Sequence, residues 1–264
     1  MPKFCANLTM LFNEVDFMDR FEKAAKAGFK GVEYLFPYAY PKEQLAEKLS
    51  TFGLVQALHN LPAGDWAKGE RGIACLPGRE GEFQDGVGKA IAYAKALKCP
   101  QVNCLVGLTP AGVPAEKVRQ TLVANLRFAA AALEKEGIRL LVETLNDKDV
   151  PGFYLARTAD ALGLIKEVGS ANLFYQYDVY HMQIMEGNLT KTIQANLAQI
   201  AHIQIADNPG RNEPGTGEIN YPYLFKAIDA AGYTGWIGCE YKPAGKTEDG
   251  LGWIKAACGC GCKS

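Results

Sequence analysis

Residues 139–146 read RLLVETLN, a short apolar run that ends on the carboxylate of Glu143 and then breaks into polar residues. Three later runs have the same form and lead to Asp178, Gln204 and Glu240: LFYQYDVYH at 173–181, AHIQIAD at 201–207 and WIGCEYK at 236–242. Short apolar, β-branched or aromatic runs of this kind are typical of the buried strands of a parallel sheet.

A polar side chain at one such strand end is ordinary, because strands meet solvent there. Four in the same register favour a shared ligand set. Three carboxylates and one amide offer only oxygen atoms, which suit Mg²⁺ or Mn²⁺ better than zinc or copper. The sequence therefore predicts one divalent-cation site formed by Glu143, Asp178, Gln204 and Glu240.

Eight strand-like runs alternate with amphipathic stretches, which predicts a (β/α)8 TIM barrel of the α/β class. Residues 16–27 and 115–136 are the clearest helices, each followed by a glycine stop. The predicted strands are Lys3–Asn7, Gly31–Phe36, Val55–Asn60, Gln101–Gly107, Arg139–Asn146, Leu173–Val179, Ala201–Asp207 and Trp236–Lys242.

An open doubly wound sheet is the competing fold. No GxGxxG or GxxxxGK[ST] follows the first strand, so no nucleotide-binding signal supports it. In a barrel the active site lies at the C-terminal strand ends, where the four ligand candidates are expected. Two long irregular stretches, 61–79 and 208–220, leave the same face and are expected to act as lids or substrate clamps.

No linker divides the chain, so we expect one catalytic domain over residues 1–257. Residues 258–264 form a Cys/Gly-rich tail that carries Cys258, Cys260 and Cys262. The tail lacks a fourth ligand at zinc-finger spacing, so we interpret it as incidental.

The composition limits the classes of partner. The chain has 264 residues, 48% hydrophobic and 22% charged, with a formal net charge of −1. Such a balance gives no bulk attraction to nucleic acid or membrane. The N-terminus reads as neither a signal peptide nor a membrane span, which favours a cytoplasmic protein with reduced cysteines. Three histidines are too few for a multinuclear zinc nuclease. A homo-oligomer stays open.

Four further residues are candidates for binding the substrate. Lys242 and Arg211 are cations expected at the metal face, where they suit an anionic substrate, although each is equally typical of a solvated loop. His181, three residues after Asp178, could donate to a substrate oxygen, and His59 ends the third strand. His202, deeper in its strand, is expected to be a hydrogen-bonded core residue.

Glu143 and Glu240 come from the fifth and eighth strands and could flank one substrate. A metal that chelates a carbonyl and a neighbouring hydroxyl acidifies the C–H between them, and two carboxylates can remove and return that proton. This is the chemistry of aldose–ketose isomerases. Epimerisation and dehydration use the same groups and stay open.

Several longer stretches carry a resemblance to a known family: FCANLTMLF at the start, GVEYLFPY around Glu33, LPGRE at 76–80, EGNLT at 186–190, GEINYPYLF at 217–225 and GYTGWIGCEYKP at 232–243. With these motifs the chain resembles the hydroxypyruvate isomerases of the xylose-isomerase-like barrel superfamily over nearly its whole length. The resemblance implies metal-assisted interconversion of hydroxypyruvate and 2-hydroxy-3-oxopropanoate (tartronate semialdehyde), with Glu143 and Glu240 as the acid/base pair.

The wider superfamily often has a histidine at the third metal position, where this chain has Gln204. The change strengthens the preference for Mg²⁺ or Mn²⁺. A sister group acts on four-carbon 2-oxo acids, so a 2-oxo-tetronate isomerase is the alternative and a ketose 3-epimerase comes third. A non-enzymatic sugar-acid binding protein would be expected to lose one flanking glutamate, and both are present.

Overall fold

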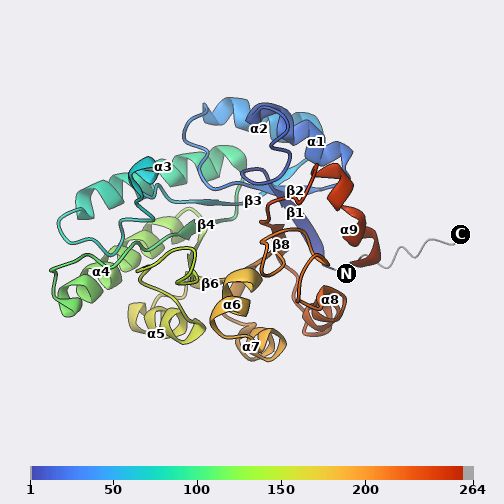
Figure 1. The fold of residues 1–264 in the computed structure, drawn as a ribbon. Helices are drawn as coiled ribbons and strands as arrows, with labels where there is room; N and C mark the ends of the chain where they lie inside the picture. The colour runs from blue at the N-terminus through green and yellow to red at the C-terminus, as the bar shows by residue number, and fades with distance from the viewer. Residues whose placement is uncertain (1, 258–264) are drawn as a thin grey trace, which may run out of the picture. The chain divides into compact units, whose positions relative to one another are not determined.

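The eight strands of the protein form a closed parallel barrel in the order β1 to β8. The computed structural model describes residues 2–257. Strand β8 pairs in parallel with both β7 and β1, which closes the sheet. The predicted barrel is therefore confirmed, and the competing open doubly wound sheet is excluded. Figure 1 labels the strands and helices along the chain. The strands are β1 Lys3–Asn7, β2 Gly31–Glu33, β3 Val55–Asn60, β4 Gln101–Cys104, β5 Arg139–Glu143, β6 Leu173–Asp178, β7 Ile200–Ile205 and β8 Trp236–Cys239.

Helices follow the strands as the periodicity predicts. In the longest of them, α4, the expected apolar stripe of Val118, Leu122, Leu126 and Ala129 is buried. The first predicted helix is a short 3₁₀ turn, η1, that runs into α1. The bounds are η1 Phe17–Asp19, α1 Arg20–Lys26, α2 Lys42–Phe52, η2 Trp66–Lys68, α3 Glu80–Leu97, α4 Ala115–Glu134, α5 Thr158–Val168, α6 Val179–Met185, α7 Leu189–Asn196, α8 Tyr221–Ala230, η3 Glu248–Gly250 and α9 Gly252–Ala257.

Several strands end earlier than the sequence predicts because long loops take over their backbone hydrogen bonds. After β4, the carbonyl of Val106 accepts from the amide of Cys75 at 2.9 Å, and Gly107 accepts from Tyr154 at 3.0 Å. Gly72 lies so close to this segment that a Cβ on it would be 1.9 Å from the Leu105 carbonyl oxygen, and its φ of 112° also requires glycine. The loop over residues 61–79 is thus attached to the end of β4.

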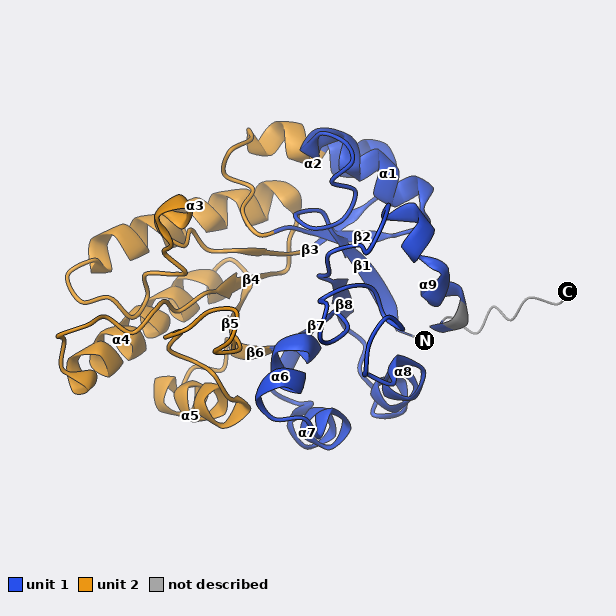
Figure 2. Cartoon of the chain, in the orientation of Figure 1, with its two compact units in different colours: residues 1–34, 47–57, 177–264 blue, residues 35–46, 58–176 orange. Residues whose placement is uncertain are grey.

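Residue contacts divide the described chain into two compact units (Figure 2). Among the described residues, unit 1 holds 2–34, 47–57 and 177–257, and unit 2 holds 35–46 and 58–176. Unit 1 contains β1, β2, β7 and β8 with helices α6 to α9. Unit 2 contains β4 and β5, most of β6, and the helices α3, α4 and α5.

Among residues 2–257, no helix is long and apolar enough to cross a membrane. Five cysteines of this range are free and buried, as expected for thiols that pack as small apolar groups: Cys5, Cys75, Cys99, Cys104 and Cys239. The tail cysteines Cys258, Cys260 and Cys262 lie outside the described residues. The division between a catalytic domain and this tail stays a prediction.

Candidate active site

Unit 1 carries three of the four predicted metal ligands at buried strand ends. Asp178 is the last residue of β6, Gln204 is the next-to-last residue of β7, and Glu240 directly follows β8. Their exposed fractions are 1%, 1% and 5%. The strands β7 and β8 are neighbours, with Gln204 paired to Gly238, and the amide of Glu240 donates to the Ile205 carbonyl at 3.1 Å. These positions are those predicted from the sequence.

The Asp178 carboxylate begins helix α6. Its Oδ1 accepts from the amides of Tyr180 at 2.7 Å and His181 at 3.1 Å, which satisfies two donors of the first helical turn. The Nε2 atom of His181 lies 3.9 Å from Oδ2 of Asp178. His181 is therefore held beside Asp178, and with 2% of its surface exposed it is a buried residue.

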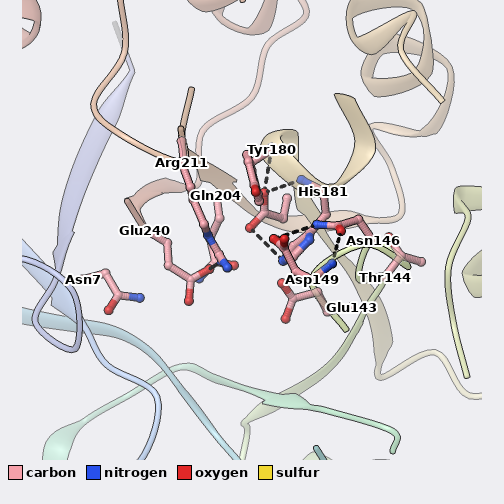
Figure 3. Close-up of polar contacts among 12 residues, drawn as sticks. Asn7, Glu143, Thr144, Asn146, Asp149, Tyr180, His181, Gln204, Arg211 and Glu240 are labelled. Carbon is pink, nitrogen blue, oxygen red and sulfur yellow. Dashed lines mark hydrogen bonds and ion pairs between the residues drawn. The ribbon is translucent and has the colours of Figure 1, made fainter. Parts of the chain in front are cut away.

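Arg211, in the loop after β7, is the cation that lies against this set. Its Nη2 is 3.3 Å from Oε2 of Glu240, and its guanidinium lies 5.0 Å from the centre of the Tyr180 ring (Figure 3). The backbone of Arg211 is left-handed, with φ of 55°, a conformation that costs a non-glycine residue free energy. Its carbonyl accepts from the Lys242 amide at 2.8 Å, while the Lys242 residue is exposed. Arg211 contacts a predicted ligand, and the Lys242 backbone supports its loop.

The amide of Gln204 is held from the barrel interior. Its Nε2 donates to Oε1 of Glu33 over 2.8 Å, and Oε1 also accepts from Nδ2 of Asn7 at 3.0 Å. Oε2 of Glu33 lies 2.6 Å from Nε2 of His202 and accepts from Sγ of Cys5 at 3.3 Å. The prediction that His202 is a hydrogen-bonded core residue is confirmed.

Glu33 is a fully buried carboxylate whose charge is stabilised locally. Burial alone would raise its pKa, but His202, Gln204 and Asn7 outweigh that effect, and the pKa lies below its ordinary value. Burial and the neighbouring Glu33 together raise the pKa of the Cys5 thiol well above its ordinary value. Cys5 therefore takes part in the network as a protonated donor.

In unit 2, Glu143 ends β5 and accepts a hydrogen bond from the next strand. Nδ2 of Asn103, on β4, donates to Oε2 of Glu143 at 2.8 Å, and both side chains are buried. The same Nδ2 lies 3.3 Å from Oδ1 of Asn60, the last residue of β3. Glu143 pairs with Gln176 of β6, two residues before that strand ends at Asp178.

His59, the fourth candidate for substrate binding, lies in β3 and is fully buried. Neither of its ring nitrogens has a side-chain hydrogen-bond partner among residues 2–257. Burial lowers its pKa to about 4, so the imidazole is neutral at pH 7. The Tyr38 ring centre is 6.2 Å from that of His59. The structure supports a neutral, enclosed histidine at this position.

The donor set fits a divalent cation of the Mg²⁺ or Mn²⁺ type. Glu143, Asp178 and Glu240 offer carboxylate oxygens, and Gln204 offers an amide oxygen. All four are nearly enclosed, and a bound cation is one of the ways in which buried carboxylates are stabilised, beside hydrogen bonds and ion pairs. The binding and catalytic roles of these residues stay predictions.

Sequence reasoning missed the residues that support the site, chiefly Glu33, which contacts Gln204, Asn103, which contacts Glu143, and Tyr180, which contacts Arg211. In the structure β2 ends on Glu33 and Asn103 is next to last in β4, but the sequence places both inside longer predicted strands, Gly31–Phe36 and Gln101–Gly107. A polar residue stands at or next to the end of each of the first four strands: Asn7, Glu33, Asn60 and Asn103. Tyr180 has no such signal, because its contact with Arg211 depends on the loop after β7.

Comparison with known proteins identifies the family. The model of the xylose isomerase-like TIM barrel matches residues 21–257. Hydroxypyruvate isomerase of Escherichia coli (strain K12) is 60% identical over 254 residues, which cover 96% of this chain and 98% of that protein. A 2-oxo-tetronate isomerase of Cupriavidus necator is 48% identical over 255 residues, covering 97% and 98%.

A solved structure has the same fold as this chain and a similar sequence. The crystal structure described as AP endonuclease, family 2, from Brucella melitensis has a TM-score of 0.94 and 48% identity, and it covers 96% of this chain and 98% of that one. The resemblance drawn from the sequence motifs is confirmed. The chain belongs to the xylose isomerase-like TIM barrel family, and its relatives within that family include hydroxypyruvate isomerase.

Proposed function

We propose that this isomerase interconverts hydroxypyruvate and 2-hydroxy-3-oxopropanoate with the help of one divalent metal ion. The observation that carries the proposal is the 60% identity to a hydroxypyruvate isomerase over nearly the full length of both chains. The buried side-chain oxygens at the strand ends also support it, since such an isomerisation needs oxygen ligands for the metal ion and carboxylates for proton transfer.

Glu143, Asp178, Gln204 and Glu240 would hold the ion. Bound there, Mg²⁺ or Mn²⁺ would polarise the carbonyl and hydroxyl oxygens of the substrate and so acidify the C–H between them. The substrate is a small anion. Arg211, whose Nη2 contacts Oε2 of Glu240, is the first candidate for binding it. Lys242, His181 and His59 are the further candidates for binding it.

The protein's own part of the reaction is proton transfer. One of Glu143 and Glu240 removes a proton from C3 of hydroxypyruvate, and the resulting enediolate is reprotonated at C2, while the C3 hydroxyl proton moves to the C2 oxygen. No atom is gained or lost, and the product is the aldehyde isomer. Asn103 holds the Glu143 carboxylate at 2.8 Å, and Arg211 contacts that of Glu240.

A four-carbon substrate is the second candidate. The 2-oxo-tetronate isomerase of Cupriavidus necator is 48% identical over 97% of this chain. Its substrate class shares the 2-oxo acid group, so the same proton transfer applies to both.

The test is a turnover assay with Mn²⁺ or Mg²⁺, three- and four-carbon hydroxy-oxo acids, and products identified by NMR in D₂O. Proton transfer through an enediolate predicts deuterium at the reacting carbon of the product. A hydride shift would keep the original hydrogen there. Preference for hydroxypyruvate over the four-carbon acid in kcat/KM supports the first candidate, and the reverse preference supports the second.

The variant that tests the acid/base role of Glu240 is Glu240→Gln. It should lower kcat by about 10²- to 10⁴-fold, the usual effect of removing a positioned acid/base group, while substrate still binds. Product free of solvent deuterium, together with near-normal turnover by Glu240→Gln, would reject both the proton-transfer mechanism and the assigned pair.

A further inference from the structure

The side-chain amide of Gln204 is fixed by its nitrogen. Nε2 donates to Oε1 of Glu33 at 2.8 Å, and the two residues are 1% and 0% exposed. An amide carries its nitrogen and oxygen on one planar carbon, so holding the nitrogen determines the direction of the oxygen. The hydrogen bond to Glu33 therefore sets where Oε1 of Gln204 points.

The orientation of the amide follows from the chemistry of its partner. Oε1 of Glu33 already accepts from Nδ2 of Asn7 at 3.0 Å, so this oxygen faces Gln204 as an acceptor. Were the amide of Gln204 turned over, its carbonyl oxygen would face the Glu33 carboxylate, and two buried acceptors would repel each other. Glu33 is thus a partner that admits only one of the two amide orientations.

Glu33 is itself held on both oxygens. Asn7 shares Oε1 with Gln204, while His202 and Cys5 bond to Oε2. Four contacts from β1 and β7 leave the carboxylate little freedom to rotate. Gly238 on β8 provides the space, because a Cβ at that position would lie 2.3 Å from Oε1 of Glu33.

Cys5, Glu33 and His202 also place possible ligand atoms within 4.8 Å of one another, which could suggest a second metal site. The distances argue against it. Two ligand atoms at about 2.0 Å from one tetrahedral ion lie roughly 3.3 Å apart. The 2.6 Å between His202 Nε2 and Glu33 Oε2 is instead a short hydrogen bond.

We propose that Glu33 is a positioning residue for the metal site, which holds the Gln204 amide so that its Oε1 is presented as the neutral oxygen ligand. The proposal rests on the proposed function in taking Gln204 as a ligand. It adds a residue from β2, outside the predicted ligand set, that decides whether that ligand is correctly oriented.

The direct test replaces Glu33 by Met, which has a similar length and only a weakly accepting sulfur in place of the carboxylate, and titrates the full-length, metal-free protein with Mn²⁺. Loss of an outer partner of a ligand typically costs about ten- to a hundredfold in metal affinity, and we expect that loss here. Glu33→Gln retains one carbonyl oxygen for Gln204 and Asn7, so its affinity should stay within about threefold of wild type. Leu126→Ala, in the buried stripe of α4, serves as a destabilised control that should bind Mn²⁺ normally.

A second readout needs no metal. The side-chain NH₂ resonances of Gln204 in protein labelled with ¹⁵N-glutamine, assigned with Gln204→Glu, report its hydrogen bond to a carboxylate. In the metal-free protein, Glu33→Met should move these resonances and Leu126→Ala should not. Unchanged Gln204 resonances in Glu33→Met would show that Glu33 does not hold the amide, and Mn²⁺ affinity within about threefold of wild type would show that holding it does not matter for the ion. Either result overturns the proposal.

A reciprocal exchange covers the case in which Glu33→Met does not fold. Gln204→Glu alone places two buried carboxylates in contact and should lose Mn²⁺ binding. In Glu33→Gln/Gln204→Glu the direction of the hydrogen bond is reversed, because the amide at position 33 now donates to the carboxylate at position 204. We expect about tenfold or greater recovery of affinity over the single variant. No recovery by a folded double variant counts against the positioning role.

The two proposals fail in different ways. Absence of saturable Mn²⁺ binding by the wild-type protein would reject the metal site of the proposed function, while the metal-free resonances of Gln204 still test its orientation by Glu33. Wild-type binding of one equivalent, unaffected in Glu33→Met, would reject the positioning role alone. A second bound equivalent that disappears in Glu33→Met would identify Glu33 as a ligand and overturn the positioning role.

Discussion

Nδ2 of Asn103 donates to Oε2 of Glu143 over 2.8 Å, with both side chains enclosed in unit 2. A buried carboxylate without a donor is costly, so this amide holds Glu143 in place and lowers the energetic cost of enclosing it. The same β4 amide reaches Asn60 on β3 at 3.3 Å. The proposed acid/base group is therefore positioned by the strand before its own.

Asn103→Ala should lower kcat by about ten- to a hundredfold, because Glu143 loses the donor that orients it. The matched control is Asn125→Ala, which removes another buried amide of unit 2, one that donates to the Ala74 carbonyl at 2.9 Å. Both variants should lose stability by a comparable amount, but only Asn103→Ala should lose turnover per folded molecule. Equal kcat in the two variants would show that the Asn103 bond serves stability alone.

Metal binding should saturate at one Mn²⁺ per chain, and Asp178→Asn should weaken it by about tenfold or more, since a charged oxygen ligand is lost. Asparagine keeps an acceptor for the Tyr180 and His181 amides, so the start of α6 should persist. Isothermal titration gives the stoichiometry and affinity. Asp160→Asn, in the first turn of α5, is the control, and undiminished affinity in Asp178→Asn would remove Asp178 from the ligand set.

Arg211→Ala should chiefly raise KM for the anionic substrate. A lost charge-assisted contact is worth about 1.5 to 3 kcal/mol, or roughly ten- to a hundredfold in affinity. Lys242 is exposed, so Lys242→Ala should have the smaller effect. Steady-state kinetics of both variants decide the matter, and an unchanged KM in each would place the binding of the substrate carboxylate elsewhere.

Gly238→Ala should destabilise the protein by about 1 to 3 kcal/mol, because the added Cβ would lie 2.3 Å from Oε1 of Glu33 in a packed core. Gly163→Ala is the control, since nothing lies within 4 Å of a Cβ at that helical position and its substitution should be neutral or slightly stabilising. Denaturant unfolding measures both. A Gly238→Ala variant as stable as wild type would mean that the Glu33 carboxylate has room to move.

His59 should make stability depend on pH. Its folded pKa of about 4 lies below the ordinary value of 6.5, so the unfolded chain binds a proton first as the pH falls. The contribution of His59 is fully present above pH 6.5 and is lost progressively towards pH 4, by up to about 1.4 kcal/mol per pH unit. Unfolding of wild type and His59→Gln at pH 7.0 and 4.5 tests this, and an equal pH-dependent loss in both would refute it.

The periodicity of the chain predicts the fold well, because each βα unit is encoded locally. β1 and β3 begin and end where the sequence predicts, and the other strands differ at their ends. Those ends depend on loops far away in the chain, as when Cys75 bonds to Val106 and Leu145 donates to Leu155. No local pattern contains that information.

The strand-end positions of the four candidate ligands were predictable for the same reason, since a polar residue at the end of an apolar run is visible in the sequence, while their role as ligands stays a prediction. Their partners were less visible. Glu33 and His202 are 169 positions apart. Closure of the sheet pairs β8 with β1, the neighbour of β2, and so brings Glu33 of β2 within reach of His202 on β7. A single sequence shows that Glu33 is polar, but not which group it accepts from.

The attachment of the 61–79 loop has a consequence for how this part of the chain can move. Its amides at Gly72 and Cys75 donate to Ala63 and Val106, each at 2.9 Å, and Arg79 forms ion pairs with Glu70 and Glu82. A swing of the whole loop away from β4 would break backbone hydrogen bonds, so it cannot behave as a freely hinged flap. Hydrogen exchange at Gly72 and Cys75 should accordingly be slow, with faster exchange confined to the exposed turn around Trp66.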